Sequence, residues 1–246
     1  MTAGAPAAAA RPSPGPFVYH FVRIVLRVLC AAYVRIRVDG AANLPTAPGG
    51  YLACFNHPSW LDPIVLAAAW PDGRRRQRVF GPREADMSVG ARNRIITWTG
   101  RAVPFRPQGA DALDAARRAA AVLRAGDALM IAGEGRLSDR EGVVRPIEPG
   151  VAHFALMAGV PVVPVGIVGT RWVHLGKRIR IVIGTPIDPA GFPRGKAGVT
   201  ALTDAIHAAV QGLVDGADDG PVPGRFGAWL SDAFNDRPWL TEEPRS

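Results

Sequence analysis

A histidine and an aspartate that lie five positions apart, His57 and Asp62, are the residues whose types and spacing best suit chemistry. An imidazole can take a proton near neutral pH, and a nearby carboxylate can hold the ring and stabilise its charged form. Residues 51–55 predict a short apolar strand, and residues 64–70 predict an apolar helix. The pair therefore falls at a strand-to-helix turn, where a rigid scaffold often presents functional side chains.

Helix capping is the structural alternative for this turn. Ser59 could cap the helix while Asp62 completes a box-like cap, or Asp62 could be the cap with Pro63 at the first helical position. Neither arrangement explains His57, and neither prevents Asp62 from contacting the histidine. No Gly-x-Ser-x-Gly elbow surrounds Ser59, so its hydroxyl is not predicted to be a nucleophile.

Three further segments follow the His57 turn in order. They are GRAVPFR at residues 100–106, GEGRLS at residues 133–138 and VPVVPVG at residues 160–166. Together with Asn56-His57 and Asp62, this series resembles the lysophosphatidic acid acyltransferase family, the PlsC-type glycerolipid acyltransferases. The resemblance extends from about residue 51 to residue 166.

The resemblance implies the transfer of an acyl group from a thioester to a lipid hydroxyl, with His57 as general base and Asp62 orienting its ring. Because guanidinium groups suit phosphate oxygens, the arginines of the second and third blocks are expected to clamp an acceptor phosphate. The implied substrate-binding positions are Asn56, Arg106, Gly133, Glu134, Gly135, Arg136 and Pro164.

Glu134 has three open interpretations. It could orient Arg136, bind an acceptor hydroxyl, or form an ordinary surface pair with Arg136 in a turn. Gly133 and Gly135 would allow close backbone approach in the same turn. Pro164 is expected to shape a strand end and the pocket for the acyl donor.

The chain departs from the family pattern in the third block and after it. Gly133 stands where the family usually has proline, and Arg136 follows the second glycine directly, where Gly-Thr-Arg is common. A basic residue often precedes the glycine that aligns with Gly150, but this chain has Glu148 and Pro149 there. The leading acceptor is 1-acyl-glycerol 3-phosphate, and an amino-lipid, a glycolipid or another lysophospholipid is the alternative.

Composition limits the partners. The 246-residue chain is 48% hydrophobic with a net charge of +8, which suits one folded domain and an anionic partner. The arginine run at residues 74–78 has no interleaved aromatics and is expected to be a solvated loop face, so nucleic acid is not predicted. Cys30 and Cys54 give neither a disulfide framework nor a metal spacing. No cofactor is predicted beyond acyl-CoA or acyl carrier protein as donor.

Residues 17–34 are strongly apolar but carry His20, Arg23 and Arg27 in one helical stripe. Two arginines near a bilayer centre would cost about 5–7 kcal/mol, so a transmembrane span is rejected. A helix in the membrane interface is predicted, with basic residues toward lipid phosphates, and a core-packed helix whose arginines reach solvent is the alternative. The predicted location is peripheral, at the cytoplasmic face of the cell membrane. A non-catalytic lipid-binding protein is the alternative of a different class.

The predicted elements alternate between strands and helices, which indicates a single α/β domain with a mixed or largely parallel central sheet flanked by helices. Strands are expected at residues 34–38, 51–55, 78–80, 102–105, 128–132, 162–168 and 178–183, and helices at 17–34, 64–70, 85–98, 111–124, 151–158 and 199–214. The predicted organisation is a disordered N-terminus (1–16), an interface helix (17–34), an acyltransferase domain (35–215) and a C-terminal tail (216–246). The tail is expected to dock on the core, and contact with lipid or with a partner is the alternative. The sequence does not predict the oligomeric state.

Overall fold

The computed structural model describes residues 16–83, 102–105, 111–218, 220–221 and 223–234. Its seven strands form one sheet in the order β1-β7-β6-β2-β5-β3-β4. All neighbouring pairs are parallel except β6 and β7, so the predicted α/β fold with a largely parallel sheet is confirmed. The strands are β1 (Arg35–Asp39), β2 (Tyr51–Phe55), β3 (Gln77–Arg83), β4 (Ala102–Phe105), β5 (Ala128–Ala132), β6 (Val162–Val168) and β7 (Arg178–Ile183).

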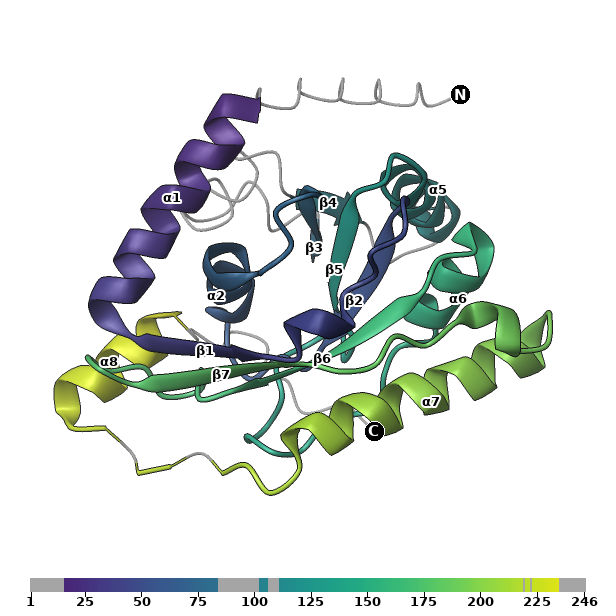
Figure 1. Ribbon diagram of the computed structural model, residues 1–246. Coiled ribbons are helices and arrows are strands. Elements are labelled where there is room, and N and C mark those ends of the chain that lie inside the picture. Colours follow the sequence, from purple (N-terminus) through teal and green to yellow (C-terminus); the bar gives the residue numbers. More distant parts are fainter. Residues whose placement is uncertain (1–15, 84–101, 106–110, 219, 222, 235–246) are drawn as a thin grey trace, which may run out of the picture.

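Helices cover both faces of the sheet (Figure 1), with α1 and α2 on one side and α5, α6 and α7 on the other. Alternate residues of β2 supply the two cores, because Ala53 and Phe55 face the α1–α2 layer while Leu52 and Cys54 face the α5–α7 layer. Burial on both faces explains the uninterrupted apolar sequences of β2 and β5. The helices are α1 (Pro16–Tyr33), α2 (Asp62–Ala69), α5 (Asp111–Arg124), α6 (Pro149–Ala158), α7 (Lys196–Val214) and α8 (Arg225–Phe234).

The sequence did not predict α8 as a separate helix. It follows a Gly-, Asp- and Pro-rich stretch, and Ser231 is buried where its hydroxyl accepts a hydrogen bond from the backbone N–H of Val173 at 2.9 Å. The predicted helix at residues 85–98, Arg106 and nearly all of the predicted disordered N-terminus lie outside the described residues.

The N-terminal helix α1 has apolar residues on two faces. Tyr19, Val22 and Cys30 are buried on its inner face, whereas the outer face exposes large aliphatic and aromatic side chains. Arg23 turns inward and donates to the carbonyl oxygen of Trp70 at 2.5 Å, so this arginine of the polar stripe contacts the protein and does not point outward toward lipid phosphates as predicted. None of the described helices is long and apolar enough to cross a membrane.

A buried polar group at the start of β2, the Asp72 cluster, holds the amino-terminal edge of the parallel strands. The Trp70 indole donates to the Tyr51 hydroxyl at 2.8 Å, and this hydroxyl donates to Asp72 Oδ2 at 3.0 Å. The Arg75 guanidinium, only 8% exposed, lies 3.0 Å from the same oxygen. The arginine run is therefore not simply a solvated face, since Arg78 also pairs with Asp127 at 3.0 Å.

The charge of Asp72 is stabilised by its partners. Burial alone would raise the pKa of this carboxyl, but the backbone N–H of Arg74, the Arg75 guanidinium and the Tyr51 hydroxyl lower it below its usual value. Desolvation dominates for Tyr51 and raises the pKa of its phenol. The Asp72 cluster thus joins α2 and the strand edge through a negative carboxylate that is fully engaged.

Candidate active site

Polar side chains gather at the opposite edge of the sheet, where the parallel strands β2, β5 and β6 end. His57 follows β2, and Glu134 follows β5. The strand register places Phe55 opposite both Ala132 and Val165. The segments that continue from these three strands therefore lie side by side, as expected at the carboxyl edge of a parallel sheet.

The structure brings His57 and Asp62 together. The Nδ1 atom of His57 lies 2.9 Å from Asp62 Oδ2, and the histidine side chain is 12% exposed while the aspartate is fully buried. The edge-to-face neighbours of the imidazole are Phe55 and Trp60, with ring centroids 6.0 and 6.2 Å away. Nε2 makes no hydrogen bond within the described residues. A ring held in this way can accept a proton at Nε2.

Asp62 also organises the turn that carries the histidine. Its Oδ2 accepts a hydrogen bond from the Ser59 backbone N–H at 2.9 Å, while the Ser59 hydroxyl accepts from the Leu61 N–H at 3.1 Å. The N-cap of α2 is Leu61, so the alternative with Asp62 as the cap is wrong. Asp62 Oδ1 is buried without a hydrogen-bond partner in the described part of the chain.

Glu134 supports the His57 loop from β5. Its carboxylate accepts hydrogen bonds from the His57 backbone N–H at 3.0 Å, the Ser138 hydroxyl at 2.7 Å and the Arg145 backbone N–H at 3.1 Å. Burial raises the pKa of Glu134, although these three hydrogen bonds act in the opposite direction. Glu134 is buried and Arg136 is exposed, so the surface-pair interpretation is wrong.

Asn56 is committed to the backbone of β6. Its amide nitrogen donates to the carbonyl oxygen of Ile167 at 2.9 Å, and its amide oxygen accepts from the Ile167 N–H at 2.7 Å. These two hydrogen bonds extend the β2–β6 pairing beyond the last residue of β2 through the side chain of Asn56. The described contacts of Asn56 therefore position the loop that carries His57.

The glycine at position 133 has a packing reason. A Cβ atom there would lie 2.5 Å from both Cys54 Sγ and Ile147 Cδ1, closer than real contacts allow. Gly135 has a φ of +66°, which favours glycine in the turn. Burial raises the pKa of the Cys54 thiol, and the charge of Glu134 raises it further, so this cysteine is a protonated core residue.

Pro164 lies in the middle of β6, opposite Cys54. It is buried, its carbonyl oxygen accepts from the Gly184 N–H at 2.9 Å, and a Cβ on Gly184 would lie 2.9 Å from its ring. The proline thus packs within the sheet layer. The expectation that Pro164 shapes a strand end is wrong, because the residue lies inside β6.

Arg136 lines a hollow of about 310 Å³, and Glu134 lines the same hollow. Arg145, which also borders it, forms an ion pair with Asp139 at 2.5 Å. Arg136 has no ion-pair partner within the described residues. Glu148 contributes a carboxylate to the same hollow. The lining residues are Glu134, Gly135, Arg136, Arg145, Pro146 and Glu148.

The sequence analysis did not identify two acidic residues near the site: Glu148, which lines the hollow, and Glu141, which is buried. Glu148 appeared only as a departure from the family pattern, and that departure was the available signal for its place beside Arg136. Glu141 accepts hydrogen bonds from the N–H groups of Gly169 and Arg171 at the end of β6. Burial raises the pKa of Glu141, and the nearby charge of Asp62 adds to this effect. Nothing in the local sequence signalled this long-range placement.

The fold and the site define an α/β protein with a histidine–aspartate pair at the carboxyl edge of its sheet and a nearby hollow that presents the exposed guanidinium of Arg136. This arrangement suits proton transfer on an anionic substrate. No group of three His, Cys, Asp or Glu side chains among the described residues is placed to hold a metal ion.

A family model described as Acyltransferase matches residues 35–168, which is more than half of the chain, and the chain therefore belongs to the acyltransferase family. It is also similar to the crystal structure of the 1-acyl-sn-glycerophosphate (LPA) acyltransferase PlsC from Thermotoga maritima. That match covers 80% of each chain at 21% identity with a TM-score of 0.60, which establishes a shared fold. No curated protein matches the chain.

Proposed function

We propose that this acyltransferase moves a fatty acyl group from acyl-CoA or acyl carrier protein to the hydroxyl of a lysophospholipid. The leading acceptor is 1-acyl-glycerol 3-phosphate, which would give phosphatidic acid for phospholipid biosynthesis. The observation that carries the proposal is the 2.9 Å contact between His57 Nδ1 and Asp62, in a member of the acyltransferase family.

In the proposed reaction the acceptor hydroxyl attacks the carbonyl carbon of the thioester while His57 Nε2 takes the hydroxyl proton. The tetrahedral intermediate then breaks its carbon–sulfur bond, and the leaving thiolate receives the proton from the imidazolium. Asp62 holds the ring and stabilises its positive charge during the transfer. General-base assistance of this kind contributes about 10²–10⁴-fold in rate. The thioester is already activated, so no acyl-enzyme is required.

The acceptor phosphate is proposed to bind Arg136, with Arg106 as a second cation. Support comes from the exposed guanidinium of Arg136 at the hollow next to Glu134, which in turn holds the His57 backbone. A phosphate bound there would be linked to the base through one buried carboxylate. Such positioning lowers the entropic part of the barrier.

An acceptor with a positively charged group is the second candidate. Glu148 borders the same hollow as Arg136 and has no ion-pair partner within the described residues. A carboxylate disfavours a doubly charged phosphate but can pair with an ammonium group, so a zwitterionic amino-lipid would satisfy both side chains.

Access to lipid is proposed to come through α1, whose outer face is apolar and exposed. Arg27 and His20 lie on the exposed part of this helix, where they could contact lipid phosphates. The enzyme would then act as a peripheral protein at the cytoplasmic face of the cell membrane.

The test is CoA release from acyl-CoA, measured with a panel of lysophospholipid acceptors and with His57→Ala as control. Release that depends on lysophosphatidic acid and on His57 supports both reaction and acceptor. Release with an amino-lipid instead retains the chemistry and replaces the substrate. If acyl-CoA gives none, acyl carrier protein is the donor to use. A lack of His57-dependent release with either donor and every acceptor overturns the proposal in favour of a lipid-binding protein.

A further inference from the structure

We propose that α8 and the turn before β7 form a second membrane-docking element beside α1, and that the hollow between them receives an acyl chain of an anionic phospholipid bilayer. The inference rests on the proposed peripheral location of the enzyme. Both α8 and the turn before β7 follow residue 168, where the segment matched by the family model ends.

The first observation is where exposed apolar side chains concentrate. Eight of the eleven large exposed hydrophobic residues in the described chain belong to α1, to α8 or to Leu175 between them. Leu175, Phe226 and Trp229 are 71%, 69% and 61% exposed. A soluble surface usually scatters such residues, and a concentration of them marks an interaction site. The five on α1 are Phe21, Ile24, Val25, Val28 and Leu29.

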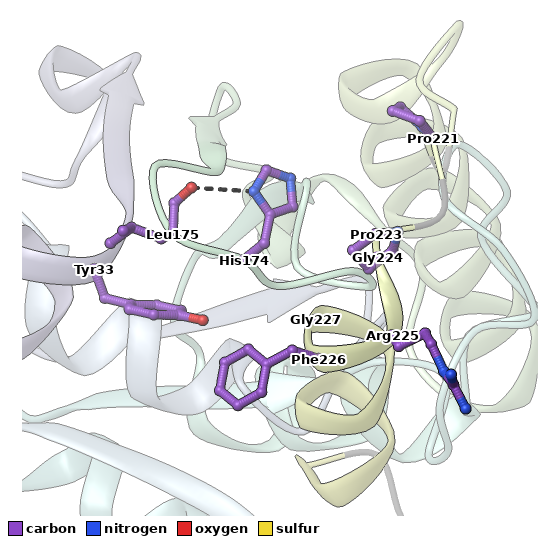
Figure 2. A pocket seen from close by; sticks show the side chains of 9 residues that line it. All are labelled: Tyr33, His174, Leu175, Pro221, Pro223, Gly224, Arg225, Phe226 and Gly227. Carbon is purple, nitrogen blue, oxygen red and sulfur yellow. Dashed lines mark hydrogen bonds between the residues drawn. The ribbon is translucent and has the colours of Figure 1, made fainter.

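The second observation is a hollow of about 760 Å³ where α1 and α8 meet. Figure 2 shows the rings of Tyr33, at the end of α1, and Phe226, in the first turn of α8, beside this space, while Arg225 points away from it. The wall is formed mostly of carbon, and its other lining residues are His174, Leu175, Pro221, Pro223, Gly224 and Gly227. The volume lies within the range of about 300–1,000 Å³ that is usual for ligand sites.

Hydrogen bonds fix the two sides of the hollow. The Gly176 N–H donates to the carbonyl oxygen of Tyr33 at 2.7 Å, which ties the turn to α1. On the other side, the Ser231 hydroxyl of α8 accepts from the Val173 N–H at 2.9 Å. A Cβ on Gly227 would lie 2.7 Å from Pro223, so glycine permits this close packing of α8. The hollow is thus built by the fold.

Charge identifies a bilayer with anionic phospholipids as the occupant. Arg35 and Arg178 are register partners in β1 and β7, and both are exposed. They follow Tyr33 and Leu175 within three residues, so cations lie next to the apolar wall. Like charges placed side by side repel unless an anion joins them. Aromatic and aliphatic residues beside arginines are the usual composition of a membrane-interface element, with the arginines at the phosphate level.

Vesicle sedimentation tests the proposal without depending on catalysis. The full chain is mixed with sucrose-loaded phosphatidylcholine vesicles that contain or lack phosphatidylglycerol. We expect Phe226→Ser combined with Trp229→Ser to lower the partition coefficient about tenfold, because two apolar side chains leave the interface. Leu113→Ser, at an exposed apolar position on α5, is the matched control and should bind like the wild type.

A second arm places Trp229 in the bilayer directly. Phosphatidylcholine with bromine on its acyl chains should quench tryptophan fluorescence in the wild type, and Trp229→Phe should remove a large part of that quenching. Unchanged quenching in Trp229→Phe, or wild-type partition of the α8 double variant, overturns the proposal. If Ile24→Ser combined with Val28→Ser abolishes binding while the α8 variant does not, α1 acts alone and the inference fails, although the proposed function stands.

A second copy of this chain is the competing occupant. If the α8 double variant changes a dimer into a monomer in light scattering and leaves vesicle partition unchanged, the inference is overturned. CoA release measured on the same samples separates the two proposals, because a loss of turnover without a loss of vesicle binding concerns only the chemistry.

Discussion

Two polar clusters lie at opposite ends of β2 and contain similar side chains, but their roles differ. The Asp72 cluster joins a carboxylate to a phenol and a guanidinium, and both oxygens of Asp72 accept hydrogen bonds. At the other end, Asp62 contacts His57, but Asp62 Oδ1 has no partner in the described residues. A saturated buried network stabilises a fold, whereas the imidazole held by Asp62 keeps Nε2 open in the described part of the chain and can accept a proton.

The arginines of the two regions differ in the same way. The Arg75 side chain is only 8% exposed and donates to Asp72 and to the carbonyl oxygens of Gly49 and Pro45, which fixes the orientation of its guanidinium. Arg136 is exposed at a hollow and has no ion-pair partner in the described chain. A guanidinium held by four hydrogen bonds to protein oxygens is structural, and one that faces solvent can bind an anion.

Asp62→Asn is expected to lower turnover strongly, and it tests the difference between the two clusters. The amide can no longer fix the imidazole in the orientation that leaves Nε2 as proton acceptor, so we expect turnover to fall by about 10²–10⁴-fold. Steady-state CoA release measures it, and circular dichroism checks the fold. Turnover close to that of the wild type would remove Asp62 from the mechanism.

Asp72→Asn should act on stability and spare turnover. Losing a charged partner for Arg75 and Tyr51 should cost about 1–3 kcal/mol at neutral pH. Because the folded pKa of Asp72 is lowered, its stabilising charge is present above the unfolded pKa and is lost as the pH falls through the folded value. Urea unfolding should therefore show the two proteins converging in acid. A difference that grows as the pH falls would contradict the assigned direction.

Arg136→Ala sharpens the contrast between free and engaged arginines. We expect the apparent KM for the acceptor to rise about tenfold with a smaller change in kcat, because a phosphate contact is lost. Arg140→Ala, at an exposed position in the same loop, is the matched control. Equal KM values for the wild type and Arg136→Ala would exclude Arg136 from the acceptor site.

Glu148→Gln should give the smallest effect, a shift in acceptor preference of about threefold to tenfold. Removing the carboxylate should favour lysophosphatidic acid over an amino-lipid, since the hollow then carries less negative charge. Competition between the two acceptors in one reaction measures the ratio. A ratio that is unaltered would mean that Glu148 does not contact the head group.

The sequence predicted those features that depend on local pattern. Continuous apolar runs gave β2 and β5, and the spacing in one turn gave the proximity of His57 and Asp62. Contacts set by strand order were not predictable, because Asn56 reaches Ile167 and Glu134 reaches the His57 backbone only once β6 and β5 flank β2. The burial of Arg75 was missed for the same reason, since its carbonyl partners lie in a loop about 30 residues away.

One paired measurement tests the central claim most directly: thioester turnover and urea unfolding, both determined for His57→Ala and Tyr51→Phe. The account predicts that His57→Ala loses about a hundredfold or more in turnover and keeps most of its stability. Tyr51→Phe should lose about 1–3 kcal/mol of stability and keep its turnover. Near-wild-type turnover in a folded His57→Ala protein would contradict the account.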